Sequence, residues 1–125
     1  SLGDLLEILS IGARARTRAE VTLNVESECQ LPDEVTLVFH RIAQEVLNNI
    51  AKHAEASSVE IKIRCTPTNA KMVIEDDGCG FDPDNIPAGH MGNGIMKERE
   101  QTIGAEILIN SQIGQGTQVS LIWTT

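Results

Sequence analysis

The clearest constraint on the fold is an alternation of apolar and polar residues over residues 58–66. The apolar members are Val59, Ile61, Ile63 and Cys65, and each residue between them is polar. This period of two is typical of a β-strand with one buried face. A short turn at 67–69 leads into a second strand-like run over 70–76, so the two strands are expected to pair antiparallel. One face of such a sheet has to be buried against a second layer.

Two amphipathic segments can supply that layer. Residues 4–18 carry apolar side chains at helical spacing, and so do the residues from Leu31 to about His53. The second segment opens with Pro32 and two acidic residues, which is a helix-start signal. Its apolar stripe is expected to face the sheet and comprises Val35, Val38, Ile42, Val46 and Ile50.

The remaining elements complete a two-layer α/β sandwich. Strands are expected at 20–26, 105–111 and 117–123, a loop at 81–91 and a short helix at 94–103. Because several neighbouring strands are joined by short turns, the sheet should be mixed and mostly antiparallel, with about three helices on one face. The length of 125 residues suits a single domain over residues 1–125.

Composition excludes several classes of function. The net charge of −8 argues against nucleic acid as a direct partner, because phosphate binding needs a clustered positive field. No apolar run approaches the roughly 20 residues of a membrane helix, so no direct membrane contact is expected. Three cysteines without a close pair argue against a disulfide framework or a zinc site and favour a cytoplasmic location. The P-loop, dinucleotide-binding, zinc-protease and esterase motifs are absent.

A polar row borders the apolar stripe of the second helix. Glu45, Asn49, Lys52 and His53 stand at i, i+4, i+7 and i+8, which puts them on one side of an α-helix. The carboxylate and amide oxygens of Glu45 and Asn49 suit Mg²⁺, which takes its other ligands from water and phosphates. Taken alone, the row favours a solvated face with its cations near the negative end of the helix dipole. The helix-weak pair of asparagines at 48–49 argues for a functional row.

A second polar cluster follows the strand at 70–76 directly. Its sequence is Asp76-Asp77-Gly78-Cys79-Gly80-Phe81. A carboxylate at a strand end can accept the exocyclic amine of adenine, and adjacent glycines let the backbone approach a flat base. The alternative is an ordinary Asp-Gly turn.

Two glycine clusters complete the set. Residues 89–94 precede the short helix, where backbone N–H groups can meet phosphate; the alternative is a flexible connector. Residues 111–117 read as a hairpin with two turn glycines. The hydroxyl of Thr117, at the start of the last strand, remains available to a base or to bound water.

The order and spacing of these clusters resemble those of a known superfamily. Gyrase, heat-shock 90 chaperones, histidine kinases and mismatch-repair ATPases share a Bergerat-type ATP-binding domain with such boxes. Residues 45–53 are similar to its N box, residues 76–80 to D-x-G-x-G, residues 92–95 to the second glycine box, and residues 114–117 to the final glycine-threonine element. The similarity is greatest to nitrate-sensor-like histidine kinases, through residues 41–45, 52–54 and 96–99.

The resemblance implies a role for each matching residue at the adenine end of the ligand. Asp76 would accept the adenine amine, and the residues around the base would be Gly78, Gly80 and Thr117.

At the phosphate end, Asn49 would hold Mg²⁺ and Glu45 would orient the ion or its water. The phosphate contacts would come from Lys52 and His53. Gly92 and Gly94 would hinge and cap a lid formed by residues 82–93. The second glycine box lacks the fuller G-x-G-x-G form, because Asn93 and Ile95-Met96 replace part of it.

The function that follows is that of a histidine protein kinase catalytic domain, cut from a longer protein. Such a domain binds Mg-ATP and donates the γ-phosphate to a histidine on a separate dimerisation domain, with a response regulator downstream. None of His40, His53 and His90 suits the acceptor role, so the fragment should bind ATP without phosphorylating itself. Three alternatives stay open: a serine kinase of the anti-sigma-factor type, a non-catalytic nucleotide-sensing module, and a hydrolase that uses Glu45 to activate water.

Overall fold

The computed structural model describes residues 2–26, 30–79 and 104–124, apart from the side chains of residues 53 and 54. The chain begins with helix α1 (Leu2–Thr17), strand β1 (Glu20–Val25) and helix α2 (Asp33–Asn49), which runs into a π-helical segment, η1 (Ile50–Ala54). The strands that follow are β2 (Ser58–Thr66), β3 (Asn69–Asp76), β4 (Glu106–Gln112) and β5 (Gly116–Thr124). The predicted loop at 81–91 and helix at 94–103 lie outside the described residues.

The five strands form one mixed sheet in the order β1-β2-β3-β5-β4. The tight turns at 67–68 and 113–115 make the β2–β3 and β4–β5 pairs antiparallel, and β3 also pairs antiparallel with β5. Only β1 and β2 are parallel within this sheet, since α2 carries the chain back between them. The prediction of a mixed, mostly antiparallel sheet is therefore confirmed.

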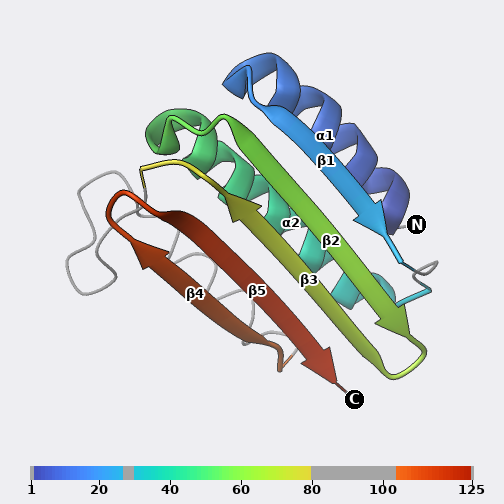
Figure 1. Ribbon diagram of the computed structural model, residues 1–125. Helices are drawn as coiled ribbons and strands as arrows, with labels where there is room; N and C mark the ends of the chain where they lie inside the picture. The colour runs from blue at the N-terminus through green and yellow to red at the C-terminus, as the bar shows by residue number, and fades with distance from the viewer. Residues whose placement is uncertain (1, 27–29, 80–103, 125) are drawn as a thin grey trace.

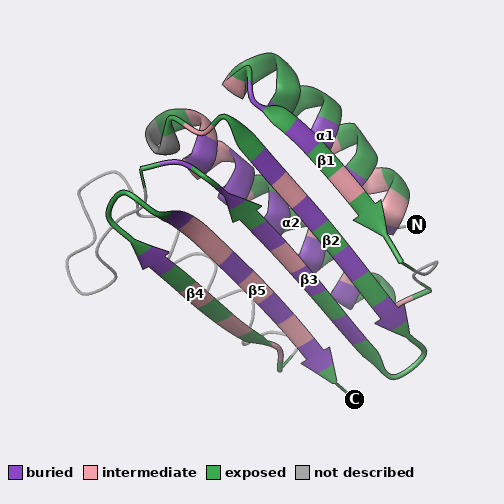
Figure 2. Ribbon diagram, viewed as in Figure 1, coloured by how far each residue is buried: buried purple, intermediate pink, exposed green. Residues whose placement is uncertain are grey.

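Both described helices cover the same face of the sheet (Figure 1). All five residues of the predicted stripe are buried, four of them on α2 and Ile50 in η1, and Phe39, Ala43 and Leu47 of α2 are buried as well. Burial alternates along the strands (Figure 2), most regularly in β2 and β3, so one strand face packs against the helices while the other stays open. The architecture is the predicted two-layer α/β sandwich.

The end of α2 differs from the prediction. The α-helix stops at Asn49, and residues 50–54 continue as a π-helix that ends at Glu55 in the left-handed conformation, with φ of 50°. A π turn takes more residues than the 3.6 of an α turn. Lys52 therefore does not extend the row of Glu45 and Asn49 at α-helical spacing, as the sequence pattern had implied.

The cysteines also differ from expectation. Cys65, buried in β2, is disulfide-bonded, whereas the sequence pattern argues against a disulfide framework. Cys79 is exposed and is not part of a disulfide. Within the three described stretches, no helix combines the length and apolar character needed to cross a membrane.

Candidate functional site

Asp76 ends β3 with its side chain on the helix-covered face of the sheet. It follows Met72 and Ile74 on that face, and only 6% of its surface is exposed. Oδ1 accepts a hydrogen bond from the Gly78 N–H at 2.8 Å, whereas Oδ2 makes none to a described residue. Burial raises the pKa of Asp76 above its ordinary value, and the Gly78 N–H opposes part of that rise. The site thus holds a buried carboxylate with one oxygen available to a donor.

Asp77, the next residue, has a structural role. Its Oδ1 accepts the backbone N–H groups of Ser57 at 2.8 Å and Ser58 at 2.9 Å. Its own N–H donates to the Ser58 carbonyl at 3.3 Å. The Ser58 and Ser57 amides lower the pKa of this exposed carboxyl below its ordinary value. Asp77 therefore ties the end of β3 to the start of β2, a role that the sequence motif did not reveal.

The β4–β5 hairpin lies against Asp76. Thr117 is the register partner of Asp76 across the β3–β5 pair, so the two side chains are on the same face, with Cβ atoms about 5 Å apart. Gly116 has φ of +85°, and a Cβ added to it would stand 2.1 Å from the Asp76 carbonyl oxygen. The Gly114 N–H donates to the Cys79 carbonyl at 2.6 Å. Two clusters distant in sequence, 76–79 and 114–117, are thus brought together.

Ser111 of β4 extends this pair into a polar row. It is the register partner of Thr117 and is 5% exposed. The Ser111 Oγ lies 2.8 Å from Thr117 Oγ1 and donates to the Gly116 carbonyl at 3.1 Å. The corresponding row two residues further into the sheet is apolar and consists of Ile74, Val119 and Ile109. Polar side chains therefore replace the apolar core at this end of the sheet.

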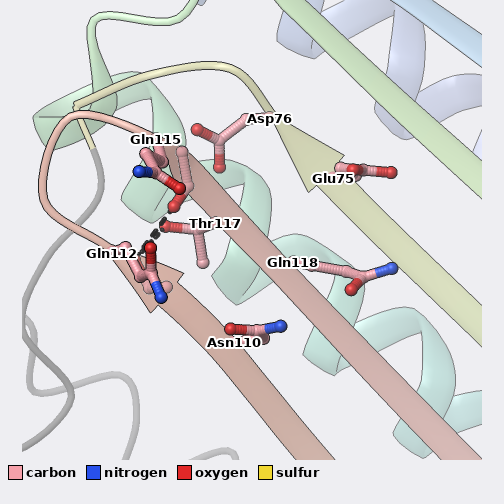
Figure 3. A pocket seen from close by; sticks show the side chains of 9 residues that line it. Glu75, Asp76, Asn110, Gln112, Gln115, Thr117 and Gln118 are labelled. Atoms are coloured by element: carbon pink, nitrogen blue, oxygen red, sulfur yellow. Dashed lines mark hydrogen bonds between the residues drawn. The ribbon is translucent and has the colours of Figure 1, made fainter.

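A pocket of about 230 Å³ opens at the same place (Figure 3). It is lined by residues of β3, β4, β5 and the hairpin turn: Glu75, Asp76, Asn110, Ser111, Gln112, Gln115, Gly116, Thr117 and Gln118. Figure 3 shows Asp76 and Thr117 at the adjacent ends of β3 and β5. The strand alternation puts Glu75, Asn110 and Gln118 on the open face, so the pocket spans the end of the sheet rather than one side of it.

The predicted metal ligands lie on α2. Glu45 and Asn49 are half-buried, one helical turn apart, and neither side chain has a hydrogen bond or ion pair with a described residue. The C-terminal ends of α2 and β3 lie at the same end of the molecule (Figure 1). No α2 residue lines the pocket around Asp76. The strand cluster and the helix row are thus at one end, as two separate groups.

Asn48 and Asn49 have different surroundings. The Arg16 guanidinium, at the end of α1, donates a hydrogen bond to Asn48 Oδ1. Asn48 therefore joins the two helices, which accounts for one of the two helix-weak asparagines without a ligand. Lys52 is exposed in η1.

Several predicted site residues lie outside the part of the chain that the structure describes. They are Gly80, Gly92, Gly94 and the lid at 82–93, together with the side chain of His53. Among the described residues, no group of three or more His, Cys, Asp or Glu side chains could hold a metal ion. A magnesium site with few protein ligands stays a prediction.

Comparisons with known proteins agree on one family. The family described as histidine kinase-, DNA gyrase B- and HSP90-like ATPase matches residues 32–124. The histidine-protein kinase/phosphatase DegS of Brevibacillus brevis is 36% identical over 90 residues, which cover 72% of this chain and 23% of DegS. The nitrate/nitrite sensor protein NarX of Escherichia coli is 29% identical over 89 residues, which cover 71% of this chain and 15% of NarX. The chain spans less than a quarter of either relative.

The fold also matches a solved kinase structure. The histidine kinase domain of a blue-light activated kinase from Erythrobacter litoralis superposes with a TM-score of 0.80 at 21% identity. The match covers 98% of this chain and 60% of that structure. The predicted fold class is confirmed by this likeness.

Proposed function

The chain belongs to the histidine kinase-, DNA gyrase B- and HSP90-like ATPase family, and we propose that it is the ATP-binding catalytic domain of a sensor histidine kinase. The observation that carries the proposal is the pairing of Asp76 with Thr117. A buried carboxylate, with one oxygen that bonds no described residue, stands beside a hydroxyl at the open end of a sheet. The adjacent Gly116 permits close approach of the backbone.

At the adenine end, Asp76 Oδ2 would accept the exocyclic amine of the base. The Gly78 N–H holds the other oxygen at 2.8 Å, so the carboxylate is oriented before the ligand arrives. A charged acceptor of this kind contributes about 1.5–3 kcal/mol per hydrogen bond. Gly78, Gly80 and Thr117 would surround the base.

At the phosphate end, Glu45 and Asn49 would face a magnesium ion. Their oxygens are half-buried and without partners among the described residues, which fits a hard cation that takes few protein ligands. The ion, when bound, would neutralise phosphate charge. Asn49 would hold it through its amide oxygen, and Glu45 would orient it or its water. Lys52 and His53 would contact phosphate oxygens, with Gly92 and Gly94 bounding a lid over them.

The domain would present the γ-phosphate of ATP to a histidine on a separate dimerisation domain. Phosphoryl transfer depends on positioning and charge neutralisation more than on covalent chemistry by the protein, so the nucleophile can come from another part of a longer protein. We therefore propose that residues 1–125 are one domain of that protein, placed in the cytoplasm and followed in the pathway by a response regulator.

Titration calorimetry with a non-hydrolysable ATP analogue and Mg²⁺ tests the binding site. Asp76→Asn and Asn49→Asp should each abolish measurable binding while the circular dichroism spectrum stays native. Each has a neighbour as its control: Asp77→Asn keeps an acceptor for the serine amides, and Asn48→Asp keeps one for Arg16. Both controls should bind normally. Wild-type affinity in both site variants would remove the assignment.

Incubation of the full-length protein with radiolabelled ATP tests the transfer. An acid-labile, base-stable phosphoprotein is expected, as for phosphohistidine. An acid-stable product on a partner protein would instead indicate the serine kinase, and steady phosphate release by this chain alone would indicate the hydrolase. If the protein binds ATP but forms no phosphoprotein and releases no phosphate, the result would indicate the non-catalytic nucleotide-sensing module.

A further inference from the structure

We propose that Ser111 makes Thr117 an obligate hydrogen-bond acceptor toward the ligand, and that this sets the preference for a 6-amino over a 6-oxo purine. The inference rests on the proposed function, since it concerns the base that Asp76 would bind. Ser111 is a positioning residue here, because it acts only through Thr117.

The argument begins with the single proton of the Ser111 hydroxyl. A serine hydroxyl has one O–H donor and two lone pairs. The Gly116 carbonyl can only accept, so the 3.1 Å contact from Ser111 Oγ uses that proton. The 2.8 Å contact between Ser111 Oγ and Thr117 Oγ1 then needs its proton from the other side. Thr117 must therefore donate to Ser111.

Once its proton points at Ser111, Thr117 has only lone pairs for any other neighbour. Thr117 is the register partner of Asp76 on the same face of the sheet. The ionised carboxylate of Asp76 also only accepts. A ligand group between these side chains thus meets two acceptors and no side-chain donor from the pair.

Two acceptors favour an amine and disfavour a carbonyl. The exocyclic amine of adenine offers two N–H donors at this position, whereas the 6-oxo group of hypoxanthine offers lone pairs. When the 6-oxo oxygen faces the acceptor oxygens of Asp76 and Thr117, these buried groups have no hydrogen-bond donor, which costs binding free energy. The same polarity holds if a water stands between Thr117 and the base, because that water must donate to Thr117.

The experiment compares the affinities of ADP and inosine diphosphate, with Mg²⁺, by titration calorimetry. Wild type should prefer ADP. Ser111→Ala frees the Thr117 hydroxyl to turn and donate to the 6-oxo group. The ADP-to-IDP affinity ratio should therefore fall about three- to tenfold, the range of one neutral hydrogen bond. Most of the fall should come from tighter IDP binding, which a general loosening of the hairpin would not produce.

The route through Thr117 has its own test. In a Thr117→Val background, Ser111→Ala should leave the affinity ratio unchanged, because the hydroxyl that it steers is gone. Ser120→Ala is the matched control, since Ser120 lies on the open face of β5. Ser111→Cys keeps the side-chain volume if the alanine variant folds poorly, and it should also lower the ratio, since a thiol is a weak acceptor.

The outcomes separate this inference from the proposed function. If wild type binds no ADP, the proposed function is wrong. If wild type prefers ADP but Ser111→Ala leaves the ratio as it was, or lowers both affinities equally, the role of Ser111 is overturned while the nucleotide site stands.

Discussion

The backbone of Gly116 approaches the carbonyl oxygen of Asp76 so closely that a Cβ would stand only 2.1 Å from it. This approach sets β5 against the end of β3 at the level of the buried carboxylate. Backbone packing, and not only side-chain chemistry, therefore determines where Asp76 and Thr117 meet.

Gly116→Ala should destabilise the protein and weaken nucleotide binding together. A left-handed conformation costs a non-glycine residue about 1–2 kcal/mol, and the clash with Asp76 adds to that cost. Gly114→Ala is the control, because Gly114 has a similar φ of +82° and a Cβ added there would meet no atom within 4 Å. Urea unfolding should show a clearly larger loss of unfolding free energy for Gly116→Ala than for Gly114→Ala. Equal losses would mean that the close approach to Asp76 does not affect stability.

Asp76→Asn should stabilise the free protein at neutral pH while removing nucleotide binding. Burial raises the pKa of Asp76, so ionisation of this carboxyl opposes folding, and the opposition fades as the pH falls through the raised value. Asparagine keeps an acceptor for the Gly78 N–H without the charge. Thermal unfolding with and without ADP measures both effects. A less stable free variant would show that the charge is structural.

Asp77→Ala should behave in the opposite way with pH. The two serine amides lower the folded pKa of Asp77 below 3.8, so its contribution to stability is full above the unfolded pKa and is lost as the pH falls through the folded one. The stability gap to wild type should be constant from neutral pH down to about 4 and close below it. Urea unfolding over this range measures the gap. Glu106→Ala, which removes an exposed acid from β4, should show no such closing gap.

Asn49→Ala should remove the dependence of nucleotide affinity on Mg²⁺. In wild type, a chelator should weaken binding of the ATP analogue, because Asn49 would hold the ion that neutralises the phosphate charge. The variant should bind weakly with or without the ion. Asn48→Ala, which loses only the Arg16 contact, should keep the full dependence. A chelator effect of the same size in Asn49→Ala would place the ion elsewhere.

The layers and strands could be predicted because their signals are local. The alternation of Val59, Ile61 and Ile63 fixes which face of β2 is buried, and the stripe on α2 fixes which side meets it. Because the turn at 67–68 is short, β3 pairs antiparallel with β2. The sequence motifs predict Asp76 and Thr117 as site residues, and the pairing of β3 with β5 brings these two residues together.

Other features depend on contacts between distant residues and have no local signal. Residues 50–54 continue the apolar pattern of α2, so the sequence predicts an α-helix there and does not indicate the π-helical segment that the structure has. In the sequence, Asp77 resembles an ordinary turn residue. Its carboxylate accepts the amides of Ser57 and Ser58 only because β2 and β3 are paired in the folded protein. Ser111 reads as part of a hairpin, and its polar row exists only once three strands are side by side.

The Asp77 carboxylate has a consequence for the dimensions of the site. It holds the amides of Ser57 and Ser58, which follow η1 closely in the chain, to the residue next to Asp76. The segment that follows η1 and the end of β3 are therefore anchored to each other by the Asp77 side chain, independently of any ligand. Under the proposed function, the distance between the base-binding and the phosphate-binding residues is therefore set by the protein before the nucleotide binds.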